Sequence, residues 1–457
     1  DRTAPSAFRT SYTKCIAVRV EGRRGFEYSR GALYWLYSLI SGTAFLLLLP
    51  VFFVKLRLIR GEPLRAAERL AFRRPPPGSG RPLLWIHAVS VGEVLSLQTL
   101  VGAIRASYPG WEVGCSTLTN AGYAVAREKL GGVDRLFLVP ADIGWCVRRV
   151  FKRLRPSLLV LVESEFWPRL LREAERRRCP VLLINGRISE RSFVRLKRYR
   201  ALSRRFLRKI ARFLVQTPLD RDRLLAVGVD ASTVEVSGNL KCDVRLPNLV
   251  PDELSRLRSE LGIGPGRRTV VAGSVHPGEE GLLLGAFREA RRERGDVVLV
   301  LAPRHPDKFA EIEKEFAGGD LVLRRRTKLV PGESWDVLLL DTIGELARFY
   351  ALSDAAFIGG SLVPHGGQNL LEPAFYGKAV FFGPSMHNFA DLAQAFVRAG
   401  AARVVEKPED IVEVFLFRNP EEVARMGRAS RAVLESLQGA TARTMAALAS
   451  VMGKPDA

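Results

Sequence analysis

Residues 158–184 read LLVLVESEFWPRLLREAERRRCPVLLI, two short apolar runs on either side of a charged stretch. The runs, 158–162 and 181–184, have the length of strands, and the residues between them have the length and pattern of a helix. A strand that is buried on both faces reads as a continuous apolar run. The segment therefore predicts a strand–helix–strand unit with two parallel strands.

The same alternation extends in both directions from this unit. In the first half of the chain, further apolar runs of strand length lie at 83–88, 111–117, 136–139 and 213–216. After a Pro- and Gly-rich pause, the runs resume at 269–272, 297–301, 337–340, 355–358, 379–382 and 402–405. This alternation predicts an α/β protein built from parallel, doubly wound sheets.

The pause at 241–267 divides the pattern into two Rossmann-like domains, 80–240 and 268–419, joined by a hinge and followed by a helical segment, 420–457. Ligands of such sheets bind beyond the carboxyl ends of the strands. Two domains of this kind are expected to face a common cleft that holds the site.

The composition excludes a mostly disordered chain, since 47% of the 457 residues are hydrophobic and 26% are charged. At roughly 100–200 residues per domain, this length suits more than one domain. The five Cys residues are scattered without CxxC spacing. They argue against a disulfide framework or a Cys-rich zinc site and favour a reducing compartment.

An uncharged apolar stretch, GALYWLYSLISGTAFLLLLPVFFV, occupies residues 31–54. A helix of this length reaches about 36 Å and predicts a retained membrane anchor. A cleaved signal peptide is the alternative, but the run is too long and no small-residue cleavage site follows it. Basic residues after the anchor favour a cytoplasmic location for the part of the chain that follows it. Residues 1–30, which do not begin with Met, carry no structural prediction, and PPPGSG (75–80) predicts a short linker.

The net charge of +22 points to nucleic acid, an anionic membrane or an acidic substrate. Residues 148–212 hold twenty-one Lys/Arg against five Asp/Glu, and residues 1–60 hold ten against three, so the excess lies in the first half.

Residues 191–212 contain ten Lys/Arg and no acid, with apolar residues at helical spacing. They predict a basic amphipathic helix, which is either a solvated face, a nucleic-acid contact or a surface for anionic lipid. The upstream anchor favours lipid, with Arg195, Arg198 and Arg205 as its contacts.

Polar residues follow the predicted strands of the first half. Glu93 lies at the start of the helix after strand 83–88, so it is either a helix-start carboxylate that interacts with the dipole or a base that points into the cleft. Glu163 directly follows strand 158–162 and is either a helix cap or a site residue. Lys241, in Asn239-Leu240-Lys241, is by itself more typical of a solvated charge.

The second half carries several glycine turns directly after strands, which suit phosphate binding because they present backbone N–H groups. Arg304 can pair with a phosphate or carboxylate, and Glu372 can accept bonds from a ribose diol. The candidate positions in these turns are Ser274, His276, Pro303, Arg304, Ile343, Gly344, Glu345, Gly360, Ser361, Asn369, Leu370, Leu371 and Glu372. Together they predict a nucleotide site.

Several other site types are disfavoured. The five His residues lie at or near these turns but lack HxH or HxxxH spacing, so no metal and no cofactor is expected. The chain has no GxxxxGK[ST], GxGxxG or GxSxG motif, which argues against a P-loop ATPase, a dehydrogenase and a serine hydrolase.

Six motifs, taken in order, carry a resemblance to a known family: IHAVSVGE (86–93), LVLVESEFWP (159–168), GNLKCD (238–243), APRHP (302–306), the stretch 341–374 and GPSMHNFAD (383–391). They resemble the 3-deoxy-D-manno-octulosonic acid (Kdo) transferases of lipopolysaccharide assembly. The resemblance runs from about residue 34 to the C-terminus. It implies a GT-B fold, CMP-Kdo as donor, lipid IVA in the inner membrane as acceptor, inversion at the anomeric carbon and no nucleic-acid partner.

The resemblance also implies roles for individual residues. Glu93 is the expected base for the 6′-hydroxyl of the lipid A precursor, and Glu163 and Lys241 are expected to stabilise the transition state. CMP is expected on Pro303 and Arg304, on Ile343 through Glu345, and on Asn369 through Glu372. The family often has His and Pro where this chain has Gln368 and Leu370.

Two other functions remain as alternatives at this point. One is a different GT-B nucleotide-sugar transferase or epimerase with a UDP-linked donor. The other is a membrane-anchored nucleic-acid-binding protein, which leaves the glycine turns of the second half without a purpose.

Overall fold

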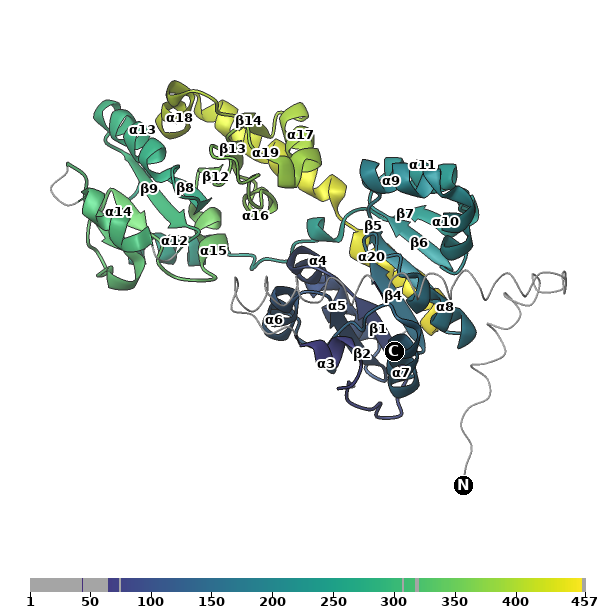
Figure 1. Ribbon diagram of the computed structural model, residues 1–457. Coiled ribbons are helices and arrows are strands. Elements are labelled where there is room, and N and C mark those ends of the chain that lie inside the picture. Colours follow the sequence, from purple (N-terminus) through teal and green to yellow (C-terminus); the bar gives the residue numbers. More distant parts are fainter. Residues whose placement is uncertain (1–42, 44–64, 74, 306–307, 317–319, 454–457) are drawn as a thin grey trace. The chain divides into compact units, whose positions relative to one another are not determined.

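The computed structural model describes Thr43 and residues 65–453, apart from 74, 306–307 and 317–319 (Figure 1). The described residues form two compact units. Unit 1 contains the residues up to Val236 together with those from Met445, and unit 2 contains Ser237–Thr444. The predicted anchor, 31–54, lies outside the described residues apart from Thr43. Among the described residues, the structure shows no helix that is both long and apolar enough to span a membrane.

Unit 1 contains one parallel sheet whose seven strands are β1 (Leu83–His87), β2 (Glu112–Thr117), β3 (Arg135–Leu138), β4 (Leu158–Val162), β5 (Val181–Gly186), β6 (Arg212–Val215) and β7 (Val234–Val236). Its helices are α3 (Ala66–Arg69), α4 (Val91–Ser96), α5 (Gln98–Ser107), α6 (Asn120–Lys129), α7 (Gly144–Leu154), α8 (Pro168–Arg176), α9 (Glu190–Arg198), α10 (Arg200–Leu207) and α11 (Pro218–Val227), with a 3-10 turn at Ala231–Thr233. Strands β1, β2, β4 and β5 are buried along their whole length, as expected for parallel strands that helices cover on both faces.

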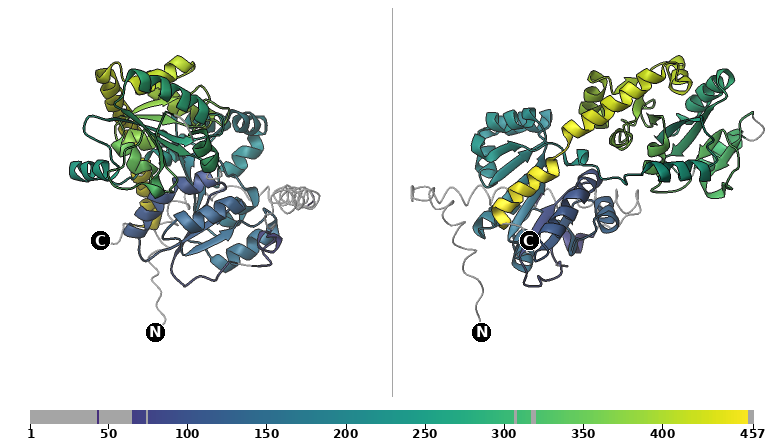
Figure 2. Two further views of the ribbon diagram at one scale, coloured as in Figure 1. Left: turned by 90° about the vertical axis from the view of Figure 1, so that its left-hand side faces the viewer. Right: turned by 180° about the vertical axis from the view of Figure 1, so that it is seen from behind.

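Unit 2 repeats this plan with β8 (Arg268–Val275), β9 (Val297–Pro303), β10 (Leu323–Arg325), β11 (Val337–Leu339), β12 (Ala355–Ile358), β13 (Ala379–Phe382) and β14 (Ala402–Val404), again all parallel. Its helices are α12 (Pro251–Glu260), α13 (Glu280–Glu293), α14 (Phe309–Phe316), α15 (Leu346–Leu352), α16 (Leu371–Phe375), α17 (Ala390–Arg398), α18 (Pro408–Leu416) and α19 (Pro420–Leu437). Three 3-10 turns are η4 (Leu240–Cys242), η6 (Arg326–Lys328) and η7 (His387–Phe389). Helix α20 (Ala440–Met452) begins in unit 2 and ends in unit 1. Helices cover both faces of each sheet (Figure 2).

The strand order defines one switch point in each sheet. In unit 1 the order is β3-β2-β1-β4-β5-β6-β7, so the chain runs from β1 out to β3 and then returns to place β4 beside β1. In unit 2 the order is β10-β11-β9-β8-β12-β13-β14, and β12 likewise returns to lie beside β8. Ligands of doubly wound sheets bind outside the carboxyl ends of the strands at this point.

The expected hinge, 241–267, is only partly irregular. Helix α12 occupies Pro251–Glu260, and Leu257, Leu261 and Ile263 are buried in a core cluster of unit 2 with Trp335. Pro and Gly flank this helix and interrupt the apolar pattern of the sequence, whereas its apolar side belongs to the core of unit 2.

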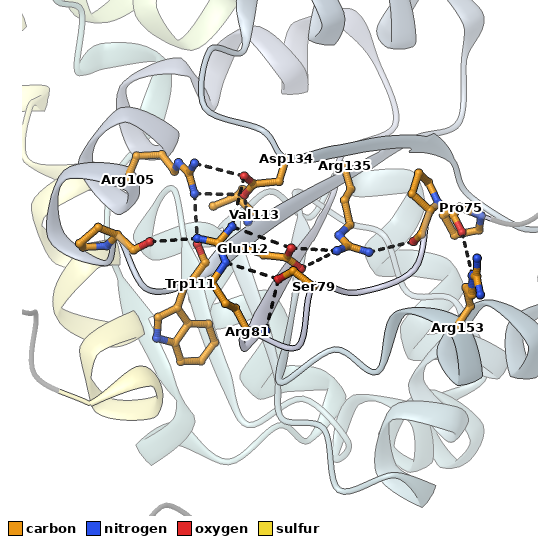
Figure 3. Close-up of polar contacts among 12 residues, drawn as sticks. Pro75, Ser79, Arg81, Arg105, Trp111, Glu112, Val113, Asp134, Arg135 and Arg153 are labelled. Atoms are coloured by element: carbon orange, nitrogen blue, oxygen red, sulfur yellow. Dashed lines mark hydrogen bonds and ion pairs between the residues drawn. The ribbon is translucent and has the colours of Figure 1, made fainter. Parts of the chain in front are cut away.

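The predicted linker at 75–80 is fastened to unit 1 by hydrogen bonds (Figure 3). Arg135 Nη1 donates to Pro76 O at 2.8 Å, and Arg153 Nε donates to Pro75 O at 3.3 Å. The same Arg135 binds both carboxylate oxygens of Glu112 from Nη2, at 2.7 and 2.8 Å. We call residues 75–81 the strap, because arginines hold it against the sheet.

The predicted basic helix is two helices, α9 and α10, that meet at Tyr199, and Arg212 already starts β6. Its apolar side is not free for lipid. Phe193, Leu196 and Phe206 pack against the core of unit 1, and Ile210 is buried in it. The exposed side keeps the positive charges and two apolar residues, Val194 and Tyr199.

Candidate active site

Glu93 lies at the switch point of unit 1, in the first turn of α4. Its N-cap, Ser90, accepts a hydrogen bond from Glu93 N at 3.4 Å. The carboxylate in turn accepts bonds from Val89 N at 2.7 Å and from Ser90 Oγ at 2.9 Å. The helix-start reading of Glu93 is therefore correct, and it is compatible with a second role.

The protonation of Glu93 is unusual for a carboxyl group. The residue is 7% exposed. Burial, with a smaller contribution from the charges of Glu163 and Glu165, raises its pKa to about 7 although the bonds from Val89 and Ser90 oppose the rise. A carboxyl group that titrates near neutral pH is suited to general base catalysis.

Glu163 follows β4, the strand that returns beside β1, so it and Glu93 lie at the same edge of the sheet. It has a left-handed backbone with φ of 59°, and its N–H donates to Ile184 O at 3.0 Å. Glu163 does not cap α8, because Trp167 is the N-cap of that helix. A non-glycine residue with positive φ at the end of a strand marks a constrained position.

Two residues that sequence reasoning did not select complete this edge. Trp167 donates from Nε1 to Glu165 Oε2 at 2.6 Å, and its ring meets the His87 ring edge-on at 5.5 Å. His87 is fully buried, and burial lowers its pKa to about 4, so the ring is neutral. Trp167 belongs to the ESEFWP motif, so the sequence offered a reason to select it. Its contact with His87 on β1 is tertiary, and the sequence does not show it.

Lys241 belongs to unit 2, on the 3-10 turn η4, where Asn239 Oδ1 accepts a bond from Lys241 N at 3.0 Å. The structure thus brings Glu93 and Glu163 together. The role of Lys241 stays a prediction.

The turn after β12 was predicted to offer its N–H groups to a phosphate, and the structure gives them another acceptor. Glu279 is fully buried and accepts bonds from Gly360 N at 2.6 Å, Ser361 N at 2.9 Å and Leu362 N at 2.8 Å. It also accepts from His276 N at 2.9 Å. The amides of Gly360 and Ser361 are therefore occupied by a carboxylate of the chain itself.

The remaining second-half candidates gather at the carboxyl edge of the unit 2 sheet. Pro303 ends β9, and Arg304 follows it with an exposed side chain. Ser274, with φ of 56°, lies where β8 shifts register against β9. Ile343 is 91% exposed in the turn after β11.

The carboxylates of this edge have partners within unit 2. Glu345 accepts from Thr342 Oγ1 at 2.5 Å and lies 3.4 Å from Arg326 Nη2, a residue that sequence reasoning did not select. Glu372 accepts from Asn369 Nδ2 at 3.2 Å, and burial raises its pKa. Leu370 and Leu371 are buried in the core, so they can reach a ligand only through their backbone.

No group of three or more His, Cys, Asp or Glu side chains among the described residues is arranged to hold a metal ion.

Two parallel α/β units with polar groups at both switch points define an architecture of the GT-B type. A UDP-GlcNAc 2-epimerase from Neisseria meningitidis shares this fold, with a TM-score of 0.54, 13% identity and coverage of 81% of this chain and 100% of that one. A putative UDP-N-acetylglucosamine 2-epimerase from Listeria monocytogenes is similar, with a TM-score of 0.51, 15% identity and coverage of 82% and 98%.

Sequence comparison is more specific. Residues 64–244 match the family model of 3-deoxy-D-manno-octulosonic-acid transferase (kdotransferase). The 3-deoxy-D-manno-octulosonic acid transferase of Bordetella pertussis is 32% identical over 397 residues, 84% of this chain and 90% of that protein. The enzyme of the same name from Haemophilus influenzae is 30% identical over 394 residues, 83% and 90%. The chain belongs to the Kdo transferase family of glycosyltransferases, as its motifs predicted.

A longer relative carries an additional activity. The bifunctional glycosyltransferase/methyltransferase of Fusobacterium nucleatum is 34% identical over 335 residues, which are 72% of this chain and 51% of that protein. The chain thus spans about half the length of this relative.

Proposed function

We propose that the protein transfers Kdo from CMP-Kdo to the 6′-hydroxyl of lipid IVA, with inversion at the anomeric carbon, in lipopolysaccharide assembly. The observation that carries the proposal is Glu93, a buried carboxyl group at the switch point of unit 1 whose pKa is raised to about 7. A substantial fraction of Glu93 is ionised at neutral pH, and the raised pKa makes its carboxylate a stronger base than an ordinary one.

In this mechanism Glu93 takes the proton of the acceptor hydroxyl as that oxygen forms a bond to the anomeric carbon of Kdo. The bond from that carbon to the phosphate oxygen breaks, and CMP leaves with the electron pair. Glu163, beside Glu93, stabilises positive charge that develops on the sugar, and Lys241 opposes the negative charge of the leaving group. Neither role requires a metal ion.

The donor side rests on the carboxyl edge of unit 2. Glu372, held by Asn369, suits the ribose diol, and exposed Ile343 offers an apolar contact to the base. Arg304 faces solvent at the end of β9, where its guanidinium can bind an oxyanion. Pro303, Gly344, Glu345, Leu370 and Leu371 complete the proposed contacts of CMP.

The acceptor side rests on the charge of unit 1. Arg195 and Arg198 lie on the exposed face of α9 and Arg205 lies on α10, and none of the three has an ion-pair partner among the described residues. We place the catalytic units at the cytoplasmic face of the inner membrane, where an anchor at 31–54 tethers them. The phosphates of lipid IVA and anionic lipids are the groups that such a basic face attracts.

The test is Glu93→Gln in the full-length protein. With CMP-Kdo and lipid IVA, the variant should lose transfer by about 10²- to 10⁴-fold, because the proton has no acceptor. The product is weighed by mass spectrometry, and CMP binding is measured by calorimetry and should stay within about twofold of wild type.

The matched control is Glu128→Gln, an exposed carboxylate of the same unit, which should leave transfer unchanged. Wild-type transfer by Glu93→Gln would refute the base assignment. A rise in melting temperature with UDP but not with CMP would refute the assignment of CMP-Kdo as the donor.

A further inference from the structure

Three histidines that are far apart in sequence meet in unit 2. The rings of His276 and His365 are stacked with centroids 4.4 Å apart, and the rings of His276 and His305 meet edge-on at 5.4 Å. His276 is 8% exposed, whereas His305 and His365 are exposed. We call these three rings the histidine stack.

The histidine stack lies at the switch point of unit 2. His276 directly follows β8, His305 follows β9, and His365 lies in the loop after β12, the strand that returns beside β8. The loop approaches the rings closely, since a Cβ on Gly360 would lie 3.0 Å from His276 Cδ2. This place corresponds to that of Glu93 and Glu163 in unit 1.

The hydrogen bonding of His276 leaves one ring nitrogen for a ligand. Gln368 Nε2 lies 3.0 Å from His276 Nε2, so this amide donates to the ring and the ring proton resides on Nδ1. Nδ1 is buried and has no hydrogen-bond partner among the described residues. A buried donor without an acceptor is costly, and a bound oxyanion would supply the acceptor.

The charges around the histidine stack favour an anion. From β8 and the turn after it, the facing group is Glu279, whose carboxylate is already surrounded by four backbone N–H groups. From β9 the facing groups are Arg304 and His305, and from the loop after β12 they are His365 and neutral Gln368. Arg304 forms no ion pair with any carboxylate among the described residues, so its charge is available to a ligand.

We propose that the histidine stack and Arg304 form an oxyanion site that takes the anionic group of the nucleotide-sugar donor. This inference rests on the proposed function and adds the residues that recognise the charged part of the donor. The phosphate of the nucleotide and the carboxylate of the sugar present the same chemistry, and the experiment separates them.

Binding at this site should be coupled to protonation. An imidazole gains its charge near pH 6.5, so an anion bound beside it favours the protonated ring. Burial, and then the neighbouring His365, lower the pKa of His276. Anion binding at pH 7.5 should therefore take up a fraction of a proton.

The experiment is calorimetry on the full-length protein at pH 7.5 with CMP, cytidine and free Kdo, in two buffers of different ionisation enthalpy. His305→Asn and His365→Asn should each weaken CMP binding about tenfold, leave cytidine binding unchanged and reduce the proton uptake. Both residues are exposed, so unchanged melting temperatures should show that the variants fold.

His387→Asn is the matched control, an exposed histidine of the same unit outside the stack, and it should bind CMP like wild type. If the His305→Asn and His365→Asn variants lose binding of Kdo and not of CMP, the site binds the carboxylate of the sugar and not the phosphate of the nucleotide. Unchanged binding of both ligands in His305→Asn and His365→Asn, or equal loss in His387→Asn, would overturn the proposal. If UMP binds and CMP does not, the proposed donor is wrong, and the same variants test the oxyanion site with UMP.

Discussion

At the scale of single residues, Glu93 combines two functions that are usually separate. Its carboxylate caps the first turn of α4 through Val89 N and Ser90 Oγ, and burial raises its pKa to about 7. The cap fixes the position of the carboxylate, and burial sets its basicity. A base that is also part of a helix start cannot swing away from the edge of the sheet.

The raised pKa of Glu93 predicts opposite effects of pH on rate and on stability. The base acts when ionised, so kcat/KM for transfer should rise with pH through about 7 and then level. The folded protein binds this proton more tightly than the unfolded chain, so stability falls as pH rises from the ordinary value of 4.5 through about 7. Glu93→Gln removes this titration and should melt a few degrees above wild type at pH 8.

The control for this prediction is the same comparison at pH 5, where Glu93 is protonated in the folded protein and the two melting curves should nearly coincide. A rate profile that stays flat between pH 5.5 and 8 would contradict the assignment.

Residue types and their positions after strands were sufficient to predict that Glu93 and Glu163 each lie at the carboxyl end of a strand; that the two strands are neighbours comes from the strand order. The same reasoning misplaced the role of Gly360 and Ser361, because it could not foresee that Glu279, about eighty residues earlier, occupies their N–H groups. It also excluded a metal site on the histidines for lack of spacing, and it selected only His276 of the three that meet. Their contact arises from strand order, which local spacing does not contain.

At the scale of elements, the strap shows how a Pro-rich segment becomes ordered. Glu112 and Arg135 are nearly inaccessible, with side chains 4% and 6% exposed. Burial opposes the ionisation of Glu112, yet hydrogen bonds from Arg135 and Ser79 hold its pKa below the ordinary value. Arg135 therefore links the ion pair on β2 and β3 to the carbonyl of Pro76.

Replacement of Arg135 by Met should destabilise the protein by about 3 kcal/mol, because the buried Glu112 carboxylate then keeps only Ser79 and a long ion pair to Arg81 at 3.9 Å. It should also expose residues 75–81 to proteases. The measurements are urea unfolding and limited proteolysis.

The double variant Arg135→Met, Glu112→Leu is the control for charge. It should recover most of the stability, since neither charge remains, but not the protection of the strap. Equal stability of the single and double variants would show that the ion pair is unimportant.

Most strands were predictable, because each is a continuous apolar run in a sheet that is covered on both faces. The short edge strands β7 and β10 were missed, since charged residues break the apolar run in VEV and LRR. The sequence predicted a short linker at 75–80 but not its fastening to unit 1, because the arginines that bind its carbonyls lie far away in the sequence.

At the scale of the whole molecule, one topology occurs twice with different chemistry at each switch point. Unit 1 places carboxylates there, and unit 2 places histidines with Arg304. The sequence predicted both parallel sheets, since apolar runs recur in each half. It did not predict that the last helix ends in unit 1, because the pattern of an amphipathic helix does not indicate which of the two units it packs against.

The positive charge of unit 1 predicts a membrane contact that is mainly electrostatic, because the apolar side of α9 and α10 is packed in the core. Neutralising Arg195, Arg198 and Arg205 together should weaken binding to vesicles with anionic lipid by roughly 1 kcal/mol per charge. CMP affinity should be unchanged. Vesicle co-sedimentation at low and high salt is the measurement.

The matched control replaces three arginines of unit 2, Arg398, Arg425 and Arg428, and should leave vesicle binding at the wild-type level. Equal loss of vesicle binding and CMP binding in the unit 1 variant would contradict a separate membrane face.

The course of α20 has a consequence for how the protein is made. Leu448 and Met452 are buried, and Tyr108 Oη donates to Gly453 O at 3.1 Å, so unit 1 is finished by the last residues that the structure describes. A ribosome that adds about 5–20 residues per second delivers them roughly 10–40 s after Val236. During that interval the nascent first unit lacks its closing helix and presents apolar surface to chaperones. No single cut in the gene yields the two units as intact pieces, whereas a circular permutation that joins 445–453 to 65–236 would.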